Sequence, residues 1–232
     1  MGASILSEVL PMNVSEKPYH YRNCWMIIKL AVVLYCFVSS RDVAAIIRYV
    51  FGINISHKTI CEWGKIFPLD IPKNKIAYTL NERIICFADE KYVWIKGVKA
   101  YWWSIRDHLG NILAYTITME RDMKSAKSLF RRAKENLSQK ITAVVHDGLR
   151  SYPRAVHSIF GRKCKSILVG IKIRAVIIDK QVYFLNNNIA ESLNAQIDAY
   201  LSKFHYNFES LESANRFAGM FFTRWNLRKD CA

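Results

Sequence analysis

The period of the apolar residues changes at Pro68 to Pro72, and this change constrains the fold more than any other feature of the chain. Before it, from Tyr21 to about Phe67, apolar residues recur every three or four positions, as they do on helices. After it, residues 83–95, 99–106 and 112–119 are dense in the branched and aromatic residues that favour strands. We therefore expect an all-helical part followed by a part built around a sheet.

The helical part has the outline of a helix-turn-helix unit. Ser39 and Asp42 stand at the spacing of a capping box, which predicts a helix starting there. Gly52 can supply a tight turn and Ser56 a second N-cap, and the helix that follows would read the major groove from its first turns. The candidate DNA-contacting residues on that helix are His57, Lys58, Thr59 and Lys65. The alternative is a solvated face on a helical packing module.

The second part has the element order of an α/β protein. His108 to Asn111 is typical of a hairpin turn, so the first three strands are expected to form an antiparallel meander. The elements expected after the meander are helices over 122–137, 151–160, 188–204 and 211–227, a strand at 141–146, and one or two strands within 167–185.

The charge of the chain indicates a polyanionic partner. Lys and Arg total 34 against 19 Asp and Glu, which gives a net charge of +15. An anionic membrane is the weaker alternative to nucleic acid. The most apolar run, Cys24 to Val38, is interrupted by Lys29 and is shorter than the about twenty residues of a spanning helix. The candidate phosphate contacts are Lys124, Lys127 and Arg131, unless these form an ordinary charged helix surface.

The N-terminus and the cysteines predict a cytoplasmic protein. No basic region followed by an apolar stretch opens the chain, so no signal peptide is visible. The six cysteines are far apart and form no CxxC pair, which indicates neither a zinc site nor a disulfide framework. Reduced thiols in a cytosolic protein are the simplest interpretation.

Three acidic residues stand near the ends of the expected elements. Asp89 ends the first strand on its apolar face, and Asp147 directly follows the strand at 141–146. If the two strands are parallel neighbours, both carboxylates lie at one edge of the sheet, where ligand sites of α/β proteins form. Glu191, in the first turn of the helix from 188, could join them. Taken singly, a strand-end Asp is usually a turn residue and a first-turn Glu usually meets the helix dipole.

Three carboxylates a few ångströms apart would repel one another unless a cation neutralised them. Oxygen ligands favour Mg²⁺ or Mn²⁺, and two such ions form a clamp for in-line displacement at phosphorus. The residues beside the acids have simpler interpretations. Alternation turns Glu90 to the opposite face of its strand, which favours no metal contact over a contact. His146 is expected to be an ordinary strand-end histidine, with support of the Asp147 site as the alternative. Trp102 and Trp103 are expected to be packing residues, with base stacking as the alternative.

Three blocks of sequence carry a more specific pattern. The first, FADEKYVWIKGVKAYWWSIRDHLGNILAYTITMERDMKSAKSLF, contains Asp-Glu-x-Tyr, Lys-Gly and Arg-Asp in order. The second is ITAVVHDGLRSYPRAV, with Asp147, Gly148 and Tyr152, and the third is NNNIAESLNAQIDAYL, with Asn188 and Glu191. These blocks resemble the DDE transposases of insertion sequences, in particular the IS-six group. SSRDVAAIIRYVFGINISHKTICEWGKIF is similar to the helix-turn-helix of that group, so the resemblance covers about residues 22–228.

The resemblance implies a fold and a domain organisation. The implied fold is an RNase H-like α/β domain with a mixed sheet and the element order βββαβαβα. It follows an N-terminal all-α helix-turn-helix unit along the chain. The expected parts are an irregular N-terminus (1–20), a helix-turn-helix domain with linker (21–75), an RNase H-like DDE catalytic domain (80–205) and a C-terminal helix (206–232).

The resemblance also implies an activity. Asp89, Asp147 and Glu191 would be the catalytic residues and the ligands of two Mg²⁺ or Mn²⁺ ions. The implied reaction hydrolyses a phosphodiester at the end of the mobile element and then joins the freed 3′-hydroxyl to target DNA. The implied partners are double-stranded DNA, at the element ends and the target, and further copies in a homodimer or higher assembly, with no membrane. The expected location is cytoplasmic, at the nucleoid of a prokaryote.

The chain departs from the pattern of this group in two places. Between Asp147 and Glu191 lie 43 residues, more than usual, and the excess is expected within 167–185 as an extra β element. One and two turns after Glu191, where the group usually carries basic residues, stand Asn194 or Ala195 and then Asp198. Two alternatives therefore stay open: an inactive or domesticated DNA-binding protein with an RNase H-like scaffold, and a nuclease acting on RNA–DNA hybrids.

Overall fold

The computed structural model describes residues 22–67, 84–137, 140–170, 172–178, 180–186, 188–203 and 208–229. The chain divides into two compact units, residues 1–72 with 219–232 and residues 73–218. The expected irregular N-terminus and the Pro68 to Pro72 segment lie outside the described residues.

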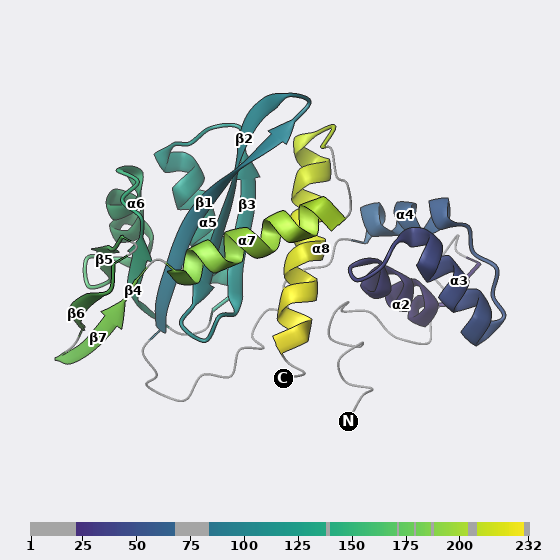
Figure 1. Cartoon of the computed structure of the whole chain (residues 1–232), viewed down its shortest axis with the longest axis horizontal. Coiled ribbons are helices and arrows are strands. Elements are labelled where there is room, and N and C mark those ends of the chain that lie inside the picture. The colour runs from purple at the N-terminus through teal and green to yellow at the C-terminus, as the bar shows by residue number, and fades with distance from the viewer. Residues whose placement is uncertain are drawn as a thin grey trace. The chain divides into compact units, whose positions relative to one another are not determined.

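The first unit contains the predicted helices with the predicted caps. The helices are α2 (Trp25–Tyr35), α3 (Ser40–Phe51) and α4 (His57–Ile66), labelled in Figure 1. The Ser39 hydroxyl accepts a hydrogen bond from the Asp42 N–H, and the Asp42 carboxylate accepts one from the Ser39 N–H, so the capping box is confirmed. Gly52 ends α3 with a φ of 66°, which favours glycine. Ser56 caps α4 by accepting from the Thr59 N–H.

An apolar core holds these helices together. Its fully or nearly buried residues include Ile28, Val32, Val43, Ile47, Ile60 and Trp63. Met220 and Leu227, from the last turns of α8 (Leu211–Lys229), pack against it. The apolar run from Cys24 is therefore a packed helix, as expected. Within the described part of the chain, no helix combines the length and apolar character needed to cross a membrane.

The second unit is a five-stranded mixed sheet with the order β3-β2-β1-β4-β5. The strands are β1 (Ile84–Ile95), β2 (Val98–Asp107), β3 (Ile112–Thr118), β4 (Ile141–His146) and β5 (Lys165–Leu168). The first three form the predicted antiparallel meander, while β4 is parallel to β1 and β5 is parallel to β4. This is the RNase H-like arrangement that the sequence predicts.

Helices cover both faces of the sheet (Figure 1). They are α5 (Met123–Glu135), α6 (Ser151–Phe160), α7 (Asn188–Lys203) and the first turns of α8. On the face of α5 and α6, Trp103 packs edge-on against Tyr152, which also contacts Phe130. On the face of α7 and α8, Trp102 packs against Phe217. Both tryptophans are fully buried, so their assignment as packing residues is confirmed.

The segment 167–185 contains more strands than expected. Besides β5, which begins at Lys165, it holds β6 (Arg174–Ile178) and β7 (Gln181–Leu185). These two strands pair antiparallel as a separate two-stranded sheet. Ile178 and Leu185 from this sheet pack against Ile85 and Phe87 of the main sheet. The extra β element between Asp147 and Glu191 is therefore confirmed, and the prediction of one or two strands was too low.

Candidate metal centre

Asp89 and Asp147 meet where β1 and β4 stop pairing. The parallel ladder ends at Phe87 and Val145, so Asp89 stands two residues beyond it, and Asp147 directly follows β4. The prediction that Asp89 ends its strand is wrong. Strand β1 continues past Asp89 to Ile95 as the partner of β2. The expected meeting of the two carboxylates is nevertheless present.

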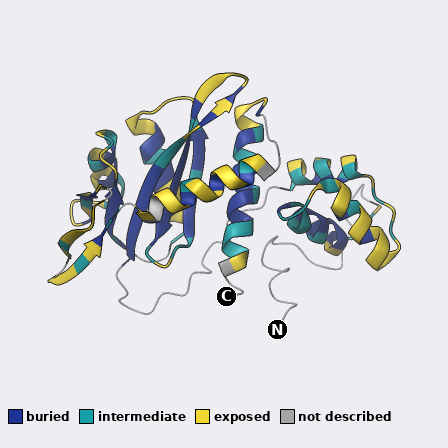
Figure 2. Ribbon diagram, in the orientation of Figure 1, coloured by how far each residue is buried: buried dark blue, intermediate teal, exposed yellow. Residues whose placement is uncertain are grey.

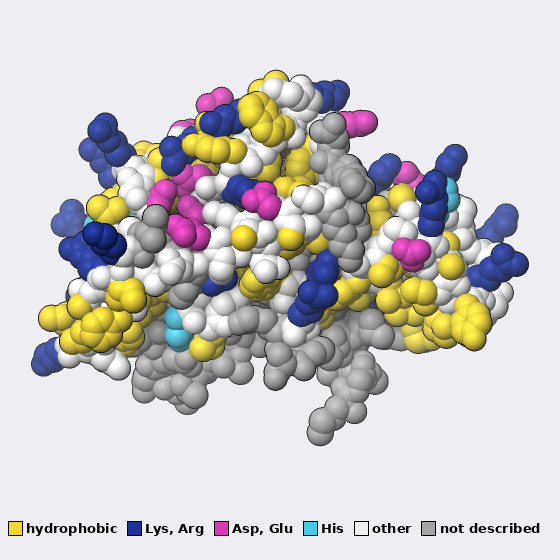
Figure 3. All heavy atoms as spheres, viewed as in Figure 1, with side chains coloured by type: hydrophobic (Ala, Val, Ile, Leu, Met, Phe, Trp, Pro, Cys, Tyr) yellow, Lys and Arg dark blue, Asp and Glu magenta, His cyan; other side chains and the backbone are white. Residues whose placement is uncertain are grey.

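A third carboxylate, that of Glu90, joins the pair. One oxygen from each of Asp89, Glu90 and Asp147 lies within 4.8 Å of the other two. Figure 3 shows Asp and Glu side chains gathered in one patch on the face that α7 crosses. Sequence alternation had placed Glu90 on the far side of the strand and given it little weight, although its neighbours Arg121 and Tyr152 belong to the same motifs.

The electrostatics of this cluster favour a cation. Asp89 is 7% exposed, and its burial, together with the charges of Asp147 and Glu90, raises its pKa to about 7. Hydrogen bonds donated by the Glu90 N–H and the Asn194 amide offset only part of that effect. A divalent cation would favour the charged carboxylates, and Mg²⁺ and Mn²⁺ take such oxygen ligands. The donor set therefore fits a divalent metal ion.

Glu90 is held by two partners of its own. Its side chain is 2% exposed. The Tyr152 hydroxyl donates to its Oε2 at 2.6 Å, and Arg121 donates to its Oε1 from Nε at 2.7 Å and also from Nη2. Burial raises the pKa of Glu90, while these hydrogen bonds oppose the rise. Both oxygens of Glu90 accept from protein donors, and so do both oxygens of Asp89, whereas the Leu149 N–H donates to Oδ1 of the exposed Asp147.

Buried contacts from β4 and β5 fix the backbone around Asp147. His146 is 2% exposed; its Nε2 lies 2.8 Å from the Ser166 hydroxyl, and its Nδ1 accepts from the Gly148 N–H at 3.2 Å. Burial lowers the pKa of His146, which favours the neutral ring that this acceptor role requires. Gly148 has a φ of 112°, a conformation that other residues rarely adopt. His146 is thus a positioning residue for the Asp147 segment.

Helix α7 lies against the acidic cluster through its polar face. The Asn194 amide donates to Oδ2 of Asp89 at 2.8 Å, and Lys91 of β1 donates to Asp198 at 2.7 Å. Glu191 is exposed and is not one of the three clustered acids. It precedes Asn194 by three residues, so the two share a helix face. This face of α7 contacts β1 through Asn194. Glu191 therefore lies one helical turn before the residue that binds the Asp89 carboxylate.

The predicted DNA-contacting residues occupy the outer faces of their helices. On α4, Lys58 is exposed, Lys65 is exposed and paired with Glu62, and His57 and Thr59 are half-buried. The Thr59 hydroxyl lies 2.9 Å from that of Ser56 in the cap. On α5, Lys124 and Arg131 are exposed and Lys127 is half-buried. Whether any of them binds DNA stays a prediction.

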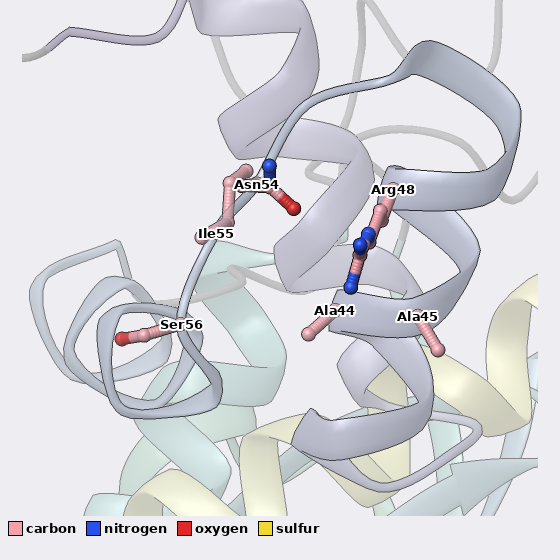
Figure 4. A pocket seen from close by; sticks show the side chains of 6 residues that line it. All are labelled: Ala44, Ala45, Arg48, Asn54, Ile55 and Ser56. Atoms are coloured by element: carbon pink, nitrogen blue, oxygen red, sulfur yellow. The ribbon is translucent and has the colours of Figure 1, made fainter.

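A shallow hollow of about 340 Å³ lies beside the start of α4. It is lined by Ala44, Ala45, Arg48, Asn54, Ile55 and Ser56. Figure 4 shows Arg48 on the α3 side and Ser56 on the α4 side. Arg48, Asn54 and Ser56 give the lining polar groups, and its other three residues are apolar, so the hollow does not by itself identify a ligand.

The strand order and the acids at the ends of the β1–β4 ladder define an RNase H-like domain with a candidate metal site. Residues 84–230 match the DDE domain of IS240-type transposases. Because this match covers more than half of the chain, the protein belongs to the DDE transposase family, as its motifs suggested.

Solved structures give more distant similarities. The HTLV-2 integrase catalytic core domain in complex with magnesium is 15% identical, with a TM-score of 0.42 over 63% of this chain and 87% of that one. A chain of the simian T-cell lymphotropic virus intasome in complex with PP2A regulatory subunit B56 gamma is 12% identical, with a TM-score of 0.42 over 83% of this chain and 67% of that one. None of the curated proteins matches the sequence.

Proposed function

We propose that the protein is a metal-dependent transposase that cleaves the ends of an insertion sequence and joins the freed 3′-hydroxyl to target DNA. The observation that carries the proposal is the buried Asp89, whose carboxylate lies within 4.8 Å of those of Asp147 and Glu90 and has a pKa of about 7. The negative charge of such a site is relieved by a proton or by a bound cation, and transposase motifs surround it.

In this proposal Asp89, Asp147 and Glu191 hold two Mg²⁺ or Mn²⁺ ions. Bound in this way, the ions supply an activated oxygen nucleophile and stabilisation of the leaving oxygen. The protein's part is to present the carboxylates in a fixed geometry. The Glu90–Arg121–Tyr152 contacts hold the strand next to Asp89, His146 and Gly148 hold the segment of Asp147, and α7 carries Glu191.

DNA is the proposed substrate because the chain carries a net charge of +15. Lys58 and Lys65 on α4, with Lys124 and Arg131 on α5, are the proposed phosphate and groove contacts. Transposition joins paired DNA ends, so we also propose a homodimer or a larger assembly.

An inactive DNA-binding protein is the second candidate, and one contact favours it. Asn194 already donates to Asp89, at a distance of 2.8 Å, where the metal would compete for the same oxygen. Asn194 also stands where related sequences usually carry a basic residue. Binding without cleavage is the behaviour this candidate predicts.

A strand-transfer assay separates the two. Purified wild-type protein is incubated with DNA carrying the element ends, with target plasmid and with Mg²⁺ or Mn²⁺, and joined products are counted. We expect Asp89→Asn and Glu191→Gln to lower joining at least ~100-fold while DNA affinity is kept, since each loses a metal ligand. Asp198→Asn is the matched control, an exposed acid on the same face of α7.

Wild-type protein that binds these ends tightly but never cuts them would favour the inactive scaffold. A substrate competition with RNA–DNA hybrids tests the remaining alternative.

A further inference from the structure

The β1–β2 hairpin extends beyond the rest of the sheet. Its strands pair from Cys86 and Asp107 to Ile95 and Val98. The pairing of β3 with β2 stops at Tyr101, and β4 leaves β1 at Phe87, so the hairpin tip is two-stranded. Figure 2 shows the strands of the sheet buried and this tip exposed.

The two faces of the tip differ. On one face Val93, Ile95 and Ala100 are buried, and the N–H of Lys96 donates to the Phe208 carbonyl. The other face is aromatic; Tyr92, Trp94 and Lys99 on it are exposed, whereas Tyr101 is half-buried against the core. Its residues, here called the aromatic face, are Tyr92, Trp94, Lys99 and Tyr101, paired across the strands as Tyr92 with Tyr101 and Trp94 with Lys99. Tyr92 is 51% and Trp94 is 59% exposed.

A cation, Lys99, is part of this face. The Lys99 ammonium lies 3.4 Å from the centre of the Tyr92 ring, and the Tyr92 and Tyr101 rings meet edge-on at 5.5 Å. Lys96, at the turn of the hairpin, is a second exposed cation near this face. Figure 3 shows hydrophobic and Lys or Arg side chains side by side at the tip. Exposed rings interleaved with cations fit a polyanion with flat faces, which is a nucleic-acid strand with unpaired bases.

The aromatic face meets the acidic site at Glu90, whose side chain lies on the opposite side of β1 from that of Asp89. Tyr92 follows Glu90 by two residues and therefore shares its side of β1. Arg121, which is bonded to Glu90, lies within electrostatic reach of the Tyr92 side chain. Two strand residues span about 7 Å. A DNA strand with one phosphate in the acidic cluster would reach the aromatic face within a few nucleotides, at about 3.4 Å per nucleotide.

We infer that the aromatic face binds unpaired nucleotides of the DNA strand that flanks the scissile phosphodiester. Trp94 stacks on a base, and Lys99 contacts a backbone phosphate. Paired bases inside a duplex cannot offer their faces to Trp94, so the surface selects DNA that is locally single-stranded. This inference rests on the proposed function and specifies where its substrate lies.

The test measures DNA affinity of the full chain by fluorescence anisotropy, in EDTA so that no catalysis contributes. The probes are a labelled single-stranded oligonucleotide and a duplex of the same sequence. We expect Trp94→Leu to weaken single-strand binding about 5- to 100-fold, the effect of losing one stacked base, and to change duplex binding less than about 2-fold. Trp94→Tyr should restore most of the affinity. Lys99→Gln should flatten the salt dependence of single-strand binding.

Phe184→Leu is the control, an aromatic residue 75% exposed on β7. It should leave both affinities unchanged. Equal losses on both probes, or none, for Trp94→Leu would overturn the inference. So would sedimentation showing that Trp94→Leu dissociates an oligomer while DNA affinity holds, because the surface would then join copies of the chain. Failure of the proposed function is distinguished by the strand-transfer assay, in which the wild-type protein would then form no joined product.

Discussion

Replacing Asp89 by Asn should remove a specific pH dependence from the stability of the metal-free protein. Burial, and then the charges of Asp147 and Glu90, raises the pKa of Asp89 from 3.8 to about 7. The folded protein therefore keeps a proton that the unfolded chain releases, so the free energy of unfolding falls as the pH rises between about 4 and 7. A shift of about three units corresponds to at most about 4 kcal/mol.

The assay is guanidinium unfolding in EDTA at pH 5 and pH 8. Between these two pH values the free energy of unfolding of the wild type should fall by about 2.7 kcal/mol more than that of Asp89→Asn, because pH 5 lies about two units below the folded pKa and already above the unfolded one. The lowered pKa of His146 acts in the opposite direction, but His146 is common to both proteins and cancels in the difference. Glu62→Gln, which removes a half-exposed acid paired with Lys65, should keep the wild-type dependence.

Identical pH dependence in wild type and Asp89→Asn would refute the reasoning, because Asp89 would then titrate in the folded protein as it does in the unfolded chain. Adding Mg²⁺ at pH 8 supplies a second reading. The wild type should gain stability with rising Mg²⁺ concentration, since the ion binds only the folded site, and Asp89→Asn should gain less.

Three further substitutions test the surroundings of the site and the first unit. Tyr152→Phe keeps the buried ring but removes a 2.6 Å hydrogen bond to Glu90, so the free energy of unfolding should drop by about 1.5–3 kcal/mol; a drop below about 0.5 kcal/mol would contradict the charged bond. Gly148→Ala should cost about 1–3 kcal/mol because of its φ of 112°, and Leu168→Ala added to it should not restore stability, since backbone strain rather than the 2.8 Å contact dominates. Ser39→Ala should cost about 1 kcal/mol in thermal unfolding through loss of the α3 cap, while an unchanged melting temperature would argue against the capping box.

Local sequence signals determined the elements of this protein. The capping box at Ser39, the left-handed turn at Gly52 and the strand-forming runs act within a few residues of themselves, so helices and strands followed from the sequence with small errors at their ends. The resemblance of the acidic motifs also identified the family, because order and spacing along the chain survive without coordinates.

The composition of the candidate metal centre was decided by the tertiary structure. Alternation along β1 turns Glu90 away from Asp89, but the parallel docking of β4 brings Asp147 within reach of both, and Arg121 and Tyr152 close around Glu90 from distant parts of the chain. The raised pKa of Asp89 arises in the same way, since burial and through-space charge depend on the distances between side chains. Sequence spacing records the order of residues, whereas these interactions depend on which strands and helices pack together.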